Sequence, residues 1–226
     1  MRKVIGLCAA IVLAGAGTTA LAQSSGYYDY GAPRALQWHI DGGYAATTGR
    51  TADYLSGGAT IGGGFTLRPD PRSPFYLRAD LNYSRFGATR ELISIGEQAN
   101  QTQIDDGTGD IVSLSLDGVL ELPIGPRARA YFMGGVGGAY RRIDLTQTVG
   151  FGGYFCDAWY GYCGFGVVAG DILVQRTETT RFAWNAGAGL EFPMYGGRSW
   201  FIEARYDRMN TDVPTEFVPI RIGMRF

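Results

Sequence analysis

The sequence predicts an all-β fold: an eight-stranded, antiparallel, up-and-down β-barrel that spans a membrane. Glycine supplies 35 of the 226 residues and aromatic side chains 13%, a composition typical of strands and tight turns. Apolar residues recur at every second position in eight segments, the period of a strand whose two faces meet different surroundings. No charged residue interrupts the apolar face across the central part of these segments, as a lipid-facing wall requires.

The first 34 residues precede the predicted barrel. Arg2 and Lys3 are followed by an apolar run and then by a small-residue site that ends at Ala22, a pattern typical of a secretory signal peptide. We therefore expect residues 1–22 to be a cleaved signal, residues 23–34 a periplasmic lead-in, and residues 35–226 the barrel.

The expected mature chain is weakly acidic. Removal of Arg2 and Lys3 leaves 18 of the 20 basic residues against 21 acidic ones, a net charge of −3. This balance argues against nucleic acid as a partner.

Seven segments carry the alternation before the final strand. Their expected lipid-facing positions, in chain order, are Leu36, Trp38, Ile40, Gly42 and Tyr44; Leu55, Ala59, Ile61, Phe65 and Leu67; Phe75, Leu77, Ala79, Leu81 and Tyr83; Val112, Leu114, Leu116, Leu120 and Leu122; Ala128, Ala130, Phe132, Val136 and Tyr140; Phe182, Trp184, Ala186, Ala188, Leu190 and Phe192; and Trp200, Ile202, Ala204 and Tyr206. The aromatic members near the two ends of the strands predict interfacial girdles.

The last ten residues predict the strand that closes the barrel. Val218, Ile220, Ile222, Met224 and Phe226 occupy one face, whereas the other carries two arginines. This segment resembles the closing strand of Gram-negative outer-membrane β-barrel proteins, in which it also serves as the assembly signal. The resemblance implies that Ile220, Ile222, Met224 and Phe226 are read by the barrel-assembly machinery, with Met224 in place of the Tyr often found there.

The connections alternate in length. Three are short and rich in Pro and Gly, namely 69–74, 123–127 and 193–199, and four are longer, namely 47–54, 87–109, 142–178 and 209–216. Short turns on one side and long loops on the other predict that both termini are periplasmic and that the long loops lie outside the cell.

Taken together, the chain resembles the small eight-stranded barrels of the OmpA, OmpX and opacity-protein kind. The resemblance implies an integral protein of the Gram-negative outer membrane, in contact with lipid and lipopolysaccharide, and a monomer. The peptidoglycan-binding domain of OmpA-type proteins is not expected here, so a role in anchoring the cell wall loses its usual support.

The face opposite the lipid is strongly charged. The expected interior network consists of Asp41, Arg78, Asp80, Asp117, Glu121, Arg129, Arg181, Glu191, Glu203, Arg205, Asp207, Arg221 and Arg225, with Arg68 at a strand end. Eight strands leave room for little beyond their own side chains, and the balanced charges favour salt bridges and a largely closed interior. The alternative is a narrow, porin-like channel for ions or small solutes, because inward glycines such as Gly62 and Gly135 could leave a wet gap.

A lipid A-modifying enzyme is a more remote alternative. His39 is the only histidine, but it falls on the inward face, as do Ser84, Ser113 and Ser115, so no nucleophile–base pair is expected to meet the membrane. No catalytic residue, cofactor or metal site is predicted. The acidic segment 105–110 does not match a calcium loop and is expected to be a solvated loop.

The longest connection carries two cysteines, Cys156 and Cys163, which we expect to form a disulfide in the oxidising periplasm. It is also rich in aromatic residues, namely Phe151, Tyr154, Phe155, Trp159, Tyr160, Tyr162 and Phe165. These are candidate contacts for a host ligand, a neighbouring surface molecule or lipopolysaccharide through loop 142–178. A compatible alternative is that the strands extend past the membrane as a protruding hairpin.

The sequence thus predicts a non-enzymatic outer-membrane protein that acts in adhesion or envelope integrity, as a structural or surface-exposed protein, through its long external loops.

Overall fold

The computed structural model describes residues 35–226 apart from 71–72, 126, 158, 160 and 195. The expected signal peptide and lead-in lie outside the described residues. No helix in this part of the chain is long and apolar enough to cross a membrane.

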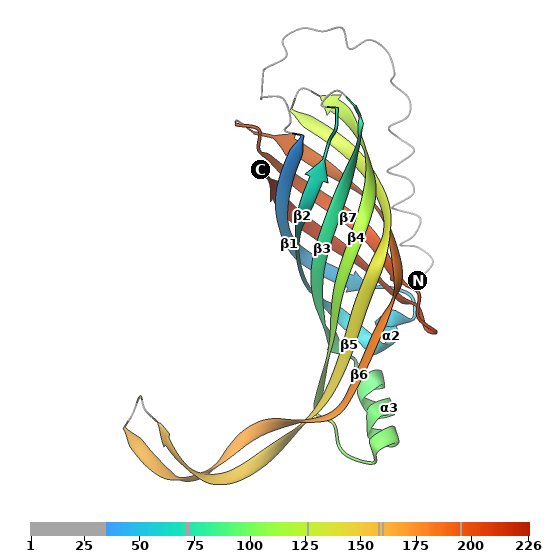
Figure 1. Ribbon diagram of the computed structural model, residues 1–226. Helices are drawn as coiled ribbons and strands as arrows, with labels where there is room; N and C mark the ends of the chain where they lie inside the picture. Colours follow the sequence, from blue (N-terminus) through green and yellow to red (C-terminus); the bar gives the residue numbers. More distant parts are fainter. Residues whose placement is uncertain (1–34, 71–72, 126, 158, 160, 195) are drawn as a thin grey trace.

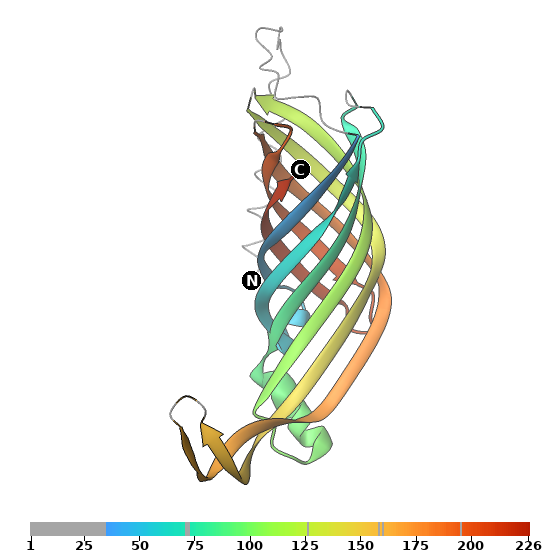
Figure 2. The same cartoon turned by 60° about the vertical axis from the view of Figure 1, so that its left-hand side comes forward.

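Eight strands form a closed barrel, in which each strand pairs with its neighbour in the chain and β8 returns to β1 (Figure 1, Figure 2). All eight pairings are antiparallel, so the predicted fold class is confirmed. The strands are β1 (Leu36–Thr47), β2 (Leu55–Leu67), β3 (Phe75–Ala88), β4 (Asp106–Gly125), β5 (Ala128–Asp157), β6 (Tyr162–Pro193), β7 (Ser199–Met209) and β8 (Thr215–Arg225).

The alternation of apolar and polar residues gives the barrel wall its two faces. Large apolar side chains such as Ile61, Leu114 and Ile222 stand exposed on the outside, where lipid replaces water, whereas arginines and carboxylates point inward. Trp38 stacks on Phe226 beside the end of the closing strand, with ring centroids 4.1 Å apart. The lipid-facing pattern of the closing strand is therefore present in the structure.

Leu55 departs from the predicted parity. It is only 2% exposed and packs in the interior beside Phe86 and Ile111, although Ala59 further along β2 faces outward as expected. The register of β2 against β3 shifts between Leu55 and Gly58, and such an irregularity reverses which face the following residues occupy. The prediction that Leu55 faces lipid was therefore wrong, because Leu55 precedes this bulge.

Two helices occupy connections that were expected to be loops. The four-residue α2 (Thr51–Tyr54) precedes β2, and α3 (Arg90–Asn100) lies between β3 and β4. Thr89 caps α3, because its side chain accepts a hydrogen bond from the backbone nitrogen of Leu92. Both helices lie at the end of the barrel opposite the C-terminus (Figure 1).

The longest connection is mostly strand. β5 and β6 remain paired from Arg129 and Glu191 as far as Asp157 and Tyr162, so the protruding hairpin is the alternative that the structure adopts. The register shifts between Leu145 and Thr146, and the hairpin turns aside beyond the barrel (Figure 1).

Helix α3 supports the base of this hairpin. Gly96 faces Leu145 of β5 so closely that a Cβ atom there would lie 2.6 Å from the Leu145 Cδ1 atom. Asn100 also donates a hydrogen bond of 2.8 Å to the side chain of Gln175 in β6. A larger residue at this position would require the Leu145 side chain to shift, and α3 therefore packs closely against the hairpin base.

Candidate functional site

The centre of the barrel is a network of ion pairs built around Arg78 of β3. Its guanidinium donates to Asp80 at 2.8 Å and, across the interior, to Glu203 of β7 at 2.7 Å. Tyr131 of β5 donates a further hydrogen bond of 2.9 Å to Glu203. Arg78 and its two carboxylate partners are fully enclosed, and each charge therefore depends on its partners instead of water.

Arg205 of β7 extends the network toward β4. It lies 2.5 Å from Asp80, 3.0 Å from Glu203 and 3.5 Å from Asp117. Asp117 also accepts hydrogen bonds from Ser115 at 3.0 Å and Asn185 at 2.7 Å. Strands β3, β4 and β7 are thus tied together through two arginines.

Arg221 of the closing strand completes the central layer. It donates to the Asn82 side chain at 2.7 Å and lies 3.7 Å from Asp41 and 3.8 Å from the partly exposed Asp207. Both oxygens of Asp41 are enclosed and lack a direct hydrogen bond among the described residues. The central layer is therefore held by charge as well as by hydrogen bonds.

A second layer lies toward the short turns. Glu121 accepts from Arg68 at 2.6 Å and from Arg129 at 3.0 Å, while Arg225 bonds Glu191. The guanidinium groups of Arg68 and Arg225 lie 4.4 Å and 5.5 Å from the centre of the Tyr76 ring. At these distances the aromatic ring attracts the two cations through cation–π interactions.

Arg181 differs from the prediction. It has the inward parity, since it pairs with the buried Ala139, but its side chain is exposed and donates to the carbonyl of Thr180. At the outer end of the barrel, the pairing of β6 with β7 stops at Ala183. Arg181 therefore lies beyond the rim of the barrel. The structure brings the other predicted network residues together inside.

His39 belongs to the same interior network. Its Nε2 atom lies 3.0 Å from Asp80 and 3.8 Å from Asp41, and its ring meets Phe201 edge to face at 5.9 Å. Ser84 donates to Thr60 and Ser115 donates to Asp117. These side chains point away from lipid. Among the described residues, no group of three or more His, Cys, Asp or Glu side chains is placed to hold a metal ion.

Two apolar clusters, which sequence reasoning missed, flank the central layer of the network. The outer seal consists of Ala45, Leu55, Phe86, Ile111, Ala139, Met209 and Phe217. The inner seal, between the central layer and the second layer, consists of Tyr76, Val119, Tyr131, Met133 and Phe201. Inward apolar residues near the strand ends, such as Ile111 and Phe217, were the signal that could have predicted them.

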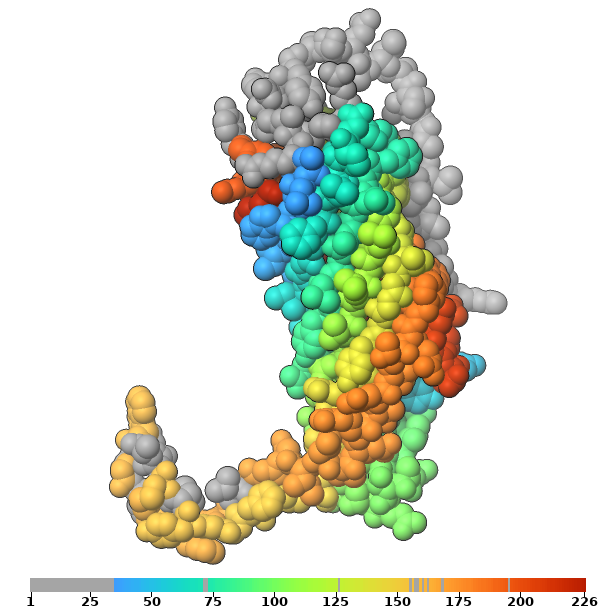
Figure 3. All heavy atoms as spheres, in the orientation of Figure 1, coloured from blue at the N-terminus to red at the C-terminus, as the bar shows by residue number. Residues whose placement is uncertain are grey.

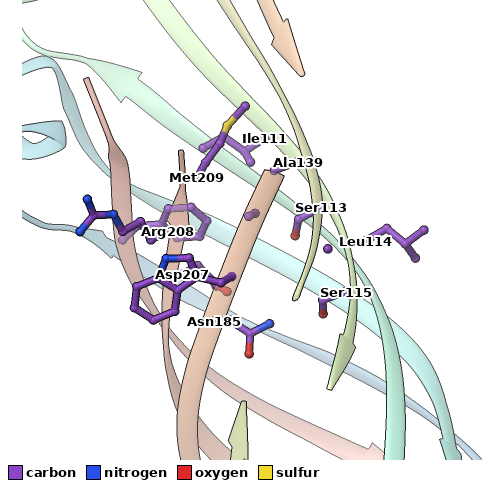
Figure 4. A pocket seen from close by; sticks show the side chains of 13 residues that line it. Ile111, Ser113, Leu114, Ser115, Ala139, Asn185, Asp207, Arg208 and Met209 are labelled. Carbon is purple, nitrogen blue, oxygen red and sulfur yellow. The ribbon is translucent and has the colours of Figure 1, made fainter. Parts of the chain in front are cut away.

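A small cavity of about 20 Å³ lies between the outer seal and the charges. Ile111, Ala139 and Met209 of the seal line it together with Asn185 and Asp207 (Figure 4). This volume accommodates about one water molecule. This cavity is therefore too small to form a water-filled path on its own.

Outside the barrel, the hairpin presents its aromatic residues at a constrained tip. Cys156 and Cys163 lie opposite each other and form the predicted disulfide, with a Cα–Cα distance of 4.0 Å. Tyr154, Trp159 and Phe165 are 73%, 90% and 80% exposed, and Phe151 is also exposed. Tyr160 lies outside the described residues, as do the side chains of Phe155 and Tyr162.

A row of charges marks the outer boundary of the lipid-facing wall. Arg85, Asp110 and Arg142 are paired across β3, β4 and β5, two residues beyond Tyr83 and Tyr140 on the outer wall. Arg142 lies 3.2 Å from Asp110. Two residues further out, Arg176 donates to Asp144 at 2.8 Å. This hydrogen bond and the nearby guanidinium charges lower the pKa of the Asp144 carboxyl.

The fold resembles solved outer-membrane structures. Neisserial surface protein A (NspA) matches with a TM-score of 0.51 and 10% identity, over 85% of this chain and 96% of that chain. A major outer membrane protein from Thermus thermophilus matches with a TM-score of 0.51 and 12% identity, over 85% of this chain and 99% of that one. At these identities the likeness concerns the fold alone. A comparison with curated proteins gave no match.

The model of the family described as "Outer membrane protein beta-barrel domain" matches residues 7–226. This match covers every strand, and the barrel, its apolar wall and its girdles are those of a protein that spans the outer membrane. The chain therefore belongs to the outer membrane protein beta-barrel domain family.

Proposed function

We propose that this protein is a non-enzymatic surface protein of the outer membrane, with a closed interior, which acts through the external hairpin of β5 and β6. One observation carries the proposal: apolar seals flank the central layer of a paired charge network, while large apolar side chains stand exposed on the hairpin. A barrel built in this way offers a contact surface in place of a pathway, and this suits a role in adhesion or envelope integrity.

The closed interior has physical support. Eight strands enclose space for their own side chains, and the arginines of the central layer each face two or more carboxylates within 4.0 Å. An ion would have to displace these pairs, pass Phe217 and Phe201 on either side of them, and then cross the second charged layer. The cavity near Asp207 favours the alternative, a narrow channel, but it is only about one water molecule in size.

The absence of catalysis is part of the proposal. His39 and Ser84, the residues that a lipid A-modifying enzyme would need at the lipid face, are enclosed: the His39 ring lies 3.0 Å from Asp80, and Ser84 donates to Thr60. A hydrolytic nucleophile needs a base within reach and access to its substrate.

We further propose that residues 1–22 are removed, that the lead-in and the C-terminus are periplasmic, and that the hairpin points away from the cell. The alternation of short and long connections supports this orientation. The apolar closing strand supports recognition of Ile220, Ile222, Met224 and Phe226 by the assembly machinery, and the complete set of strand pairings supports a monomer.

The first test separates a surface protein from a pore. The purified, folded protein should show no ion conductance steps in a planar lipid bilayer, and reproducible steps would establish that the barrel is a channel.

The second test removes residues 148–171 and joins the paired residues Gln147 and Ile172 through an Asn-Gly turn. Cells carrying this variant should lose surface adhesion or envelope integrity although the barrel inserts normally, and an unchanged phenotype would contradict the role of the hairpin.

A further inference from the structure

The distal hairpin, residues 147–157 of β5 and 162–172 of β6, is almost uncharged. Asp157 and Asp171 are its only charged residues, and glycine and aromatic residues dominate the segment. Soluble surfaces normally mix charges of both signs, and large exposed apolar areas mark places where something binds. The composition therefore indicates a contact with an apolar partner.

The strand register places the most exposed apolar residues of the two paired strands on one face. Tyr154 lies opposite Phe165, Gly152 opposite Val167, and Cys156 opposite Cys163. Opposite residues share a face and every second residue returns to it, so these residues form one surface, here called the tip face. Phe165 and Val167 are 80% and 74% exposed. On the reverse side Phe151 packs against Gly170 and is less exposed, at 54%.

The distal hairpin has no neighbouring strand in the described part of the chain. The pairing of β4 with β5 ends at Asp106 and Thr146, and β7 reaches β6 only as far as Ala183. A two-stranded ribbon is marginally stable alone in water. Its disulfide constrains the tip, but its apolar side chains gain stability only by leaving water.

The position of the ribbon points to the surrounding bilayer. The ribbon leaves the barrel sideways and its tip turns back along the direction of the barrel wall (Figure 1, Figure 2, Figure 3). It continues from β5 and β6, whose outward residues, such as Val136 and Phe182, form part of the lipid-facing wall. The charged residues Asp110 and Arg142 at its base, with Arg176 two residues further out, mark the level of the headgroups, since charges lie just beyond the interfacial aromatic residues.

We propose that the tip face lies in the interfacial zone of the membrane that surrounds the barrel, as a second, lateral anchor. Trp and Tyr side chains prefer this zone, because one part of the ring is apolar and the other meets water. An uncharged surface suits lipid better than a specific protein partner, which would be matched by polar contacts at its rim. This inference rests on the proposed role of the hairpin as the contact surface and assigns lipid as its partner.

The test uses Trp159, which lies at the tip and is 90% exposed. A variant with Trp38, Trp184 and Trp200 replaced by Phe retains one tryptophan and is placed, one copy per disc, in phospholipid nanodiscs. Brominated lipids should quench most of the Trp159 emission, and aqueous iodide should quench little. Phe165→Asp should reverse both effects by drawing the tip into water, whereas Gln147→Asp, on the reverse face near the base, should leave both unchanged.

Full quenching by iodide with none by brominated lipid would overturn the proposal. If Trp159 becomes shielded from iodide only when two copies share a disc, the partner is a second copy and the lipid assignment fails. Should the tryptophan replacements prevent folding, the unmodified protein gives the same test by NMR. Lipids that carry a paramagnetic headgroup should broaden the Val167 methyl signals, and unbroadened signals would refute the contact. These measurements do not depend on conductance or on the cellular phenotype, so the proposed function and the lipid contact can fail separately.

Discussion

Arg78 of β3 donates a 2.7 Å hydrogen bond to Glu203 of β7, and 125 residues of chain separate the two. Neither side chain reaches water. The bond crosses the interior of the barrel and joins two walls that share no strand pairing. The contributions of this bond and of the surrounding side chains to stability and assembly can be tested one residue at a time.

Arg78→Met should lower the free energy of unfolding by ~3–5 kcal/mol, because Asp80 and Glu203 would lose a cation while remaining buried. Urea titration of the folded protein in lipid vesicles, followed by heat-shifted gel mobility, measures the change. Arg85→Met is the matched control: the Arg85 side chain is 62% exposed, and its loss should cost at most ~1 kcal/mol. Equal losses in both variants would mean that the interior pairs carry no special stability.

Phe217→Ala should open the outer seal without making a pore. Phe217 packs edge to face on Phe86, with ring centroids 5.3 Å apart, and its truncation joins the small cavity to the solvent. The side-chain amide of Asn185, which lines this cavity, should exchange its protons faster by NMR, while bilayer recordings stay silent because the inner seal around Phe201 persists. Ion steps from this single variant would show that one seal alone blocks conduction. Phe182→Ala, on the lipid face, should change neither measurement.

Ile220→Arg should prevent stable insertion. Ile220 is exposed on the outer wall, and an arginine facing lipid near the midplane costs ~2–4 kcal/mol. The fraction of protein that acquires folded, heat-shifted mobility in membranes is the measurement. Val213→Arg places the same charge in the connection between β7 and β8, and it should assemble normally. Normal assembly of the Ile220 variant would contradict the outward assignment of the closing strand.

The contact of Asp144 with Arg176 should weaken in acid. The pKa of Asp144 is lowered by Arg176, below the ~3.9 of an ordinary aspartate. A lowered pKa in the folded state means that the contribution to stability is complete above the unfolded value and is lost as the pH falls through the folded one. The carboxyl carbon of Asp144 should report this low midpoint by NMR, and Arg176→Gln should move the midpoint upward. An unmoved midpoint would mean that another group holds the carboxylate.

The disulfide of the tip should protect both cysteines from alkylation. In envelopes that have not been reduced, iodoacetamide should label neither Cys156 nor Cys163, and a reductant should expose both. By restricting the unfolded chain, a disulfide that closes so small a ring stabilises the folded hairpin by about 2–3 kcal/mol. The double variant Cys156→Ser, Cys163→Ser should therefore increase hydrogen exchange in the distal hairpin and leave exchange in the barrel unchanged. Labelling without reductant would show that the native tip holds free thiols.

The sequence by itself determined which residues face lipid along most of the wall, how many strands there are, and that the two cysteines of the aromatic segment pair. These features follow from local rules: a strand alternates its faces at every residue, and a membrane admits no charge on the face that meets it. Ile220 and Ile222 needed no knowledge of their neighbours to be assigned outward.

The tertiary structure alone decided the partners and the exceptions. Arg78 meets Glu203 only because the register around a closed barrel brings β3 across from β7, and no local pattern contains that register. Leu55 turned inward through a bulge, and Arg181 left the interior because β7 ends before reaching it. The two seals and the sideways hairpin likewise depend on where strands end relative to one another, which is settled by packing between distant segments.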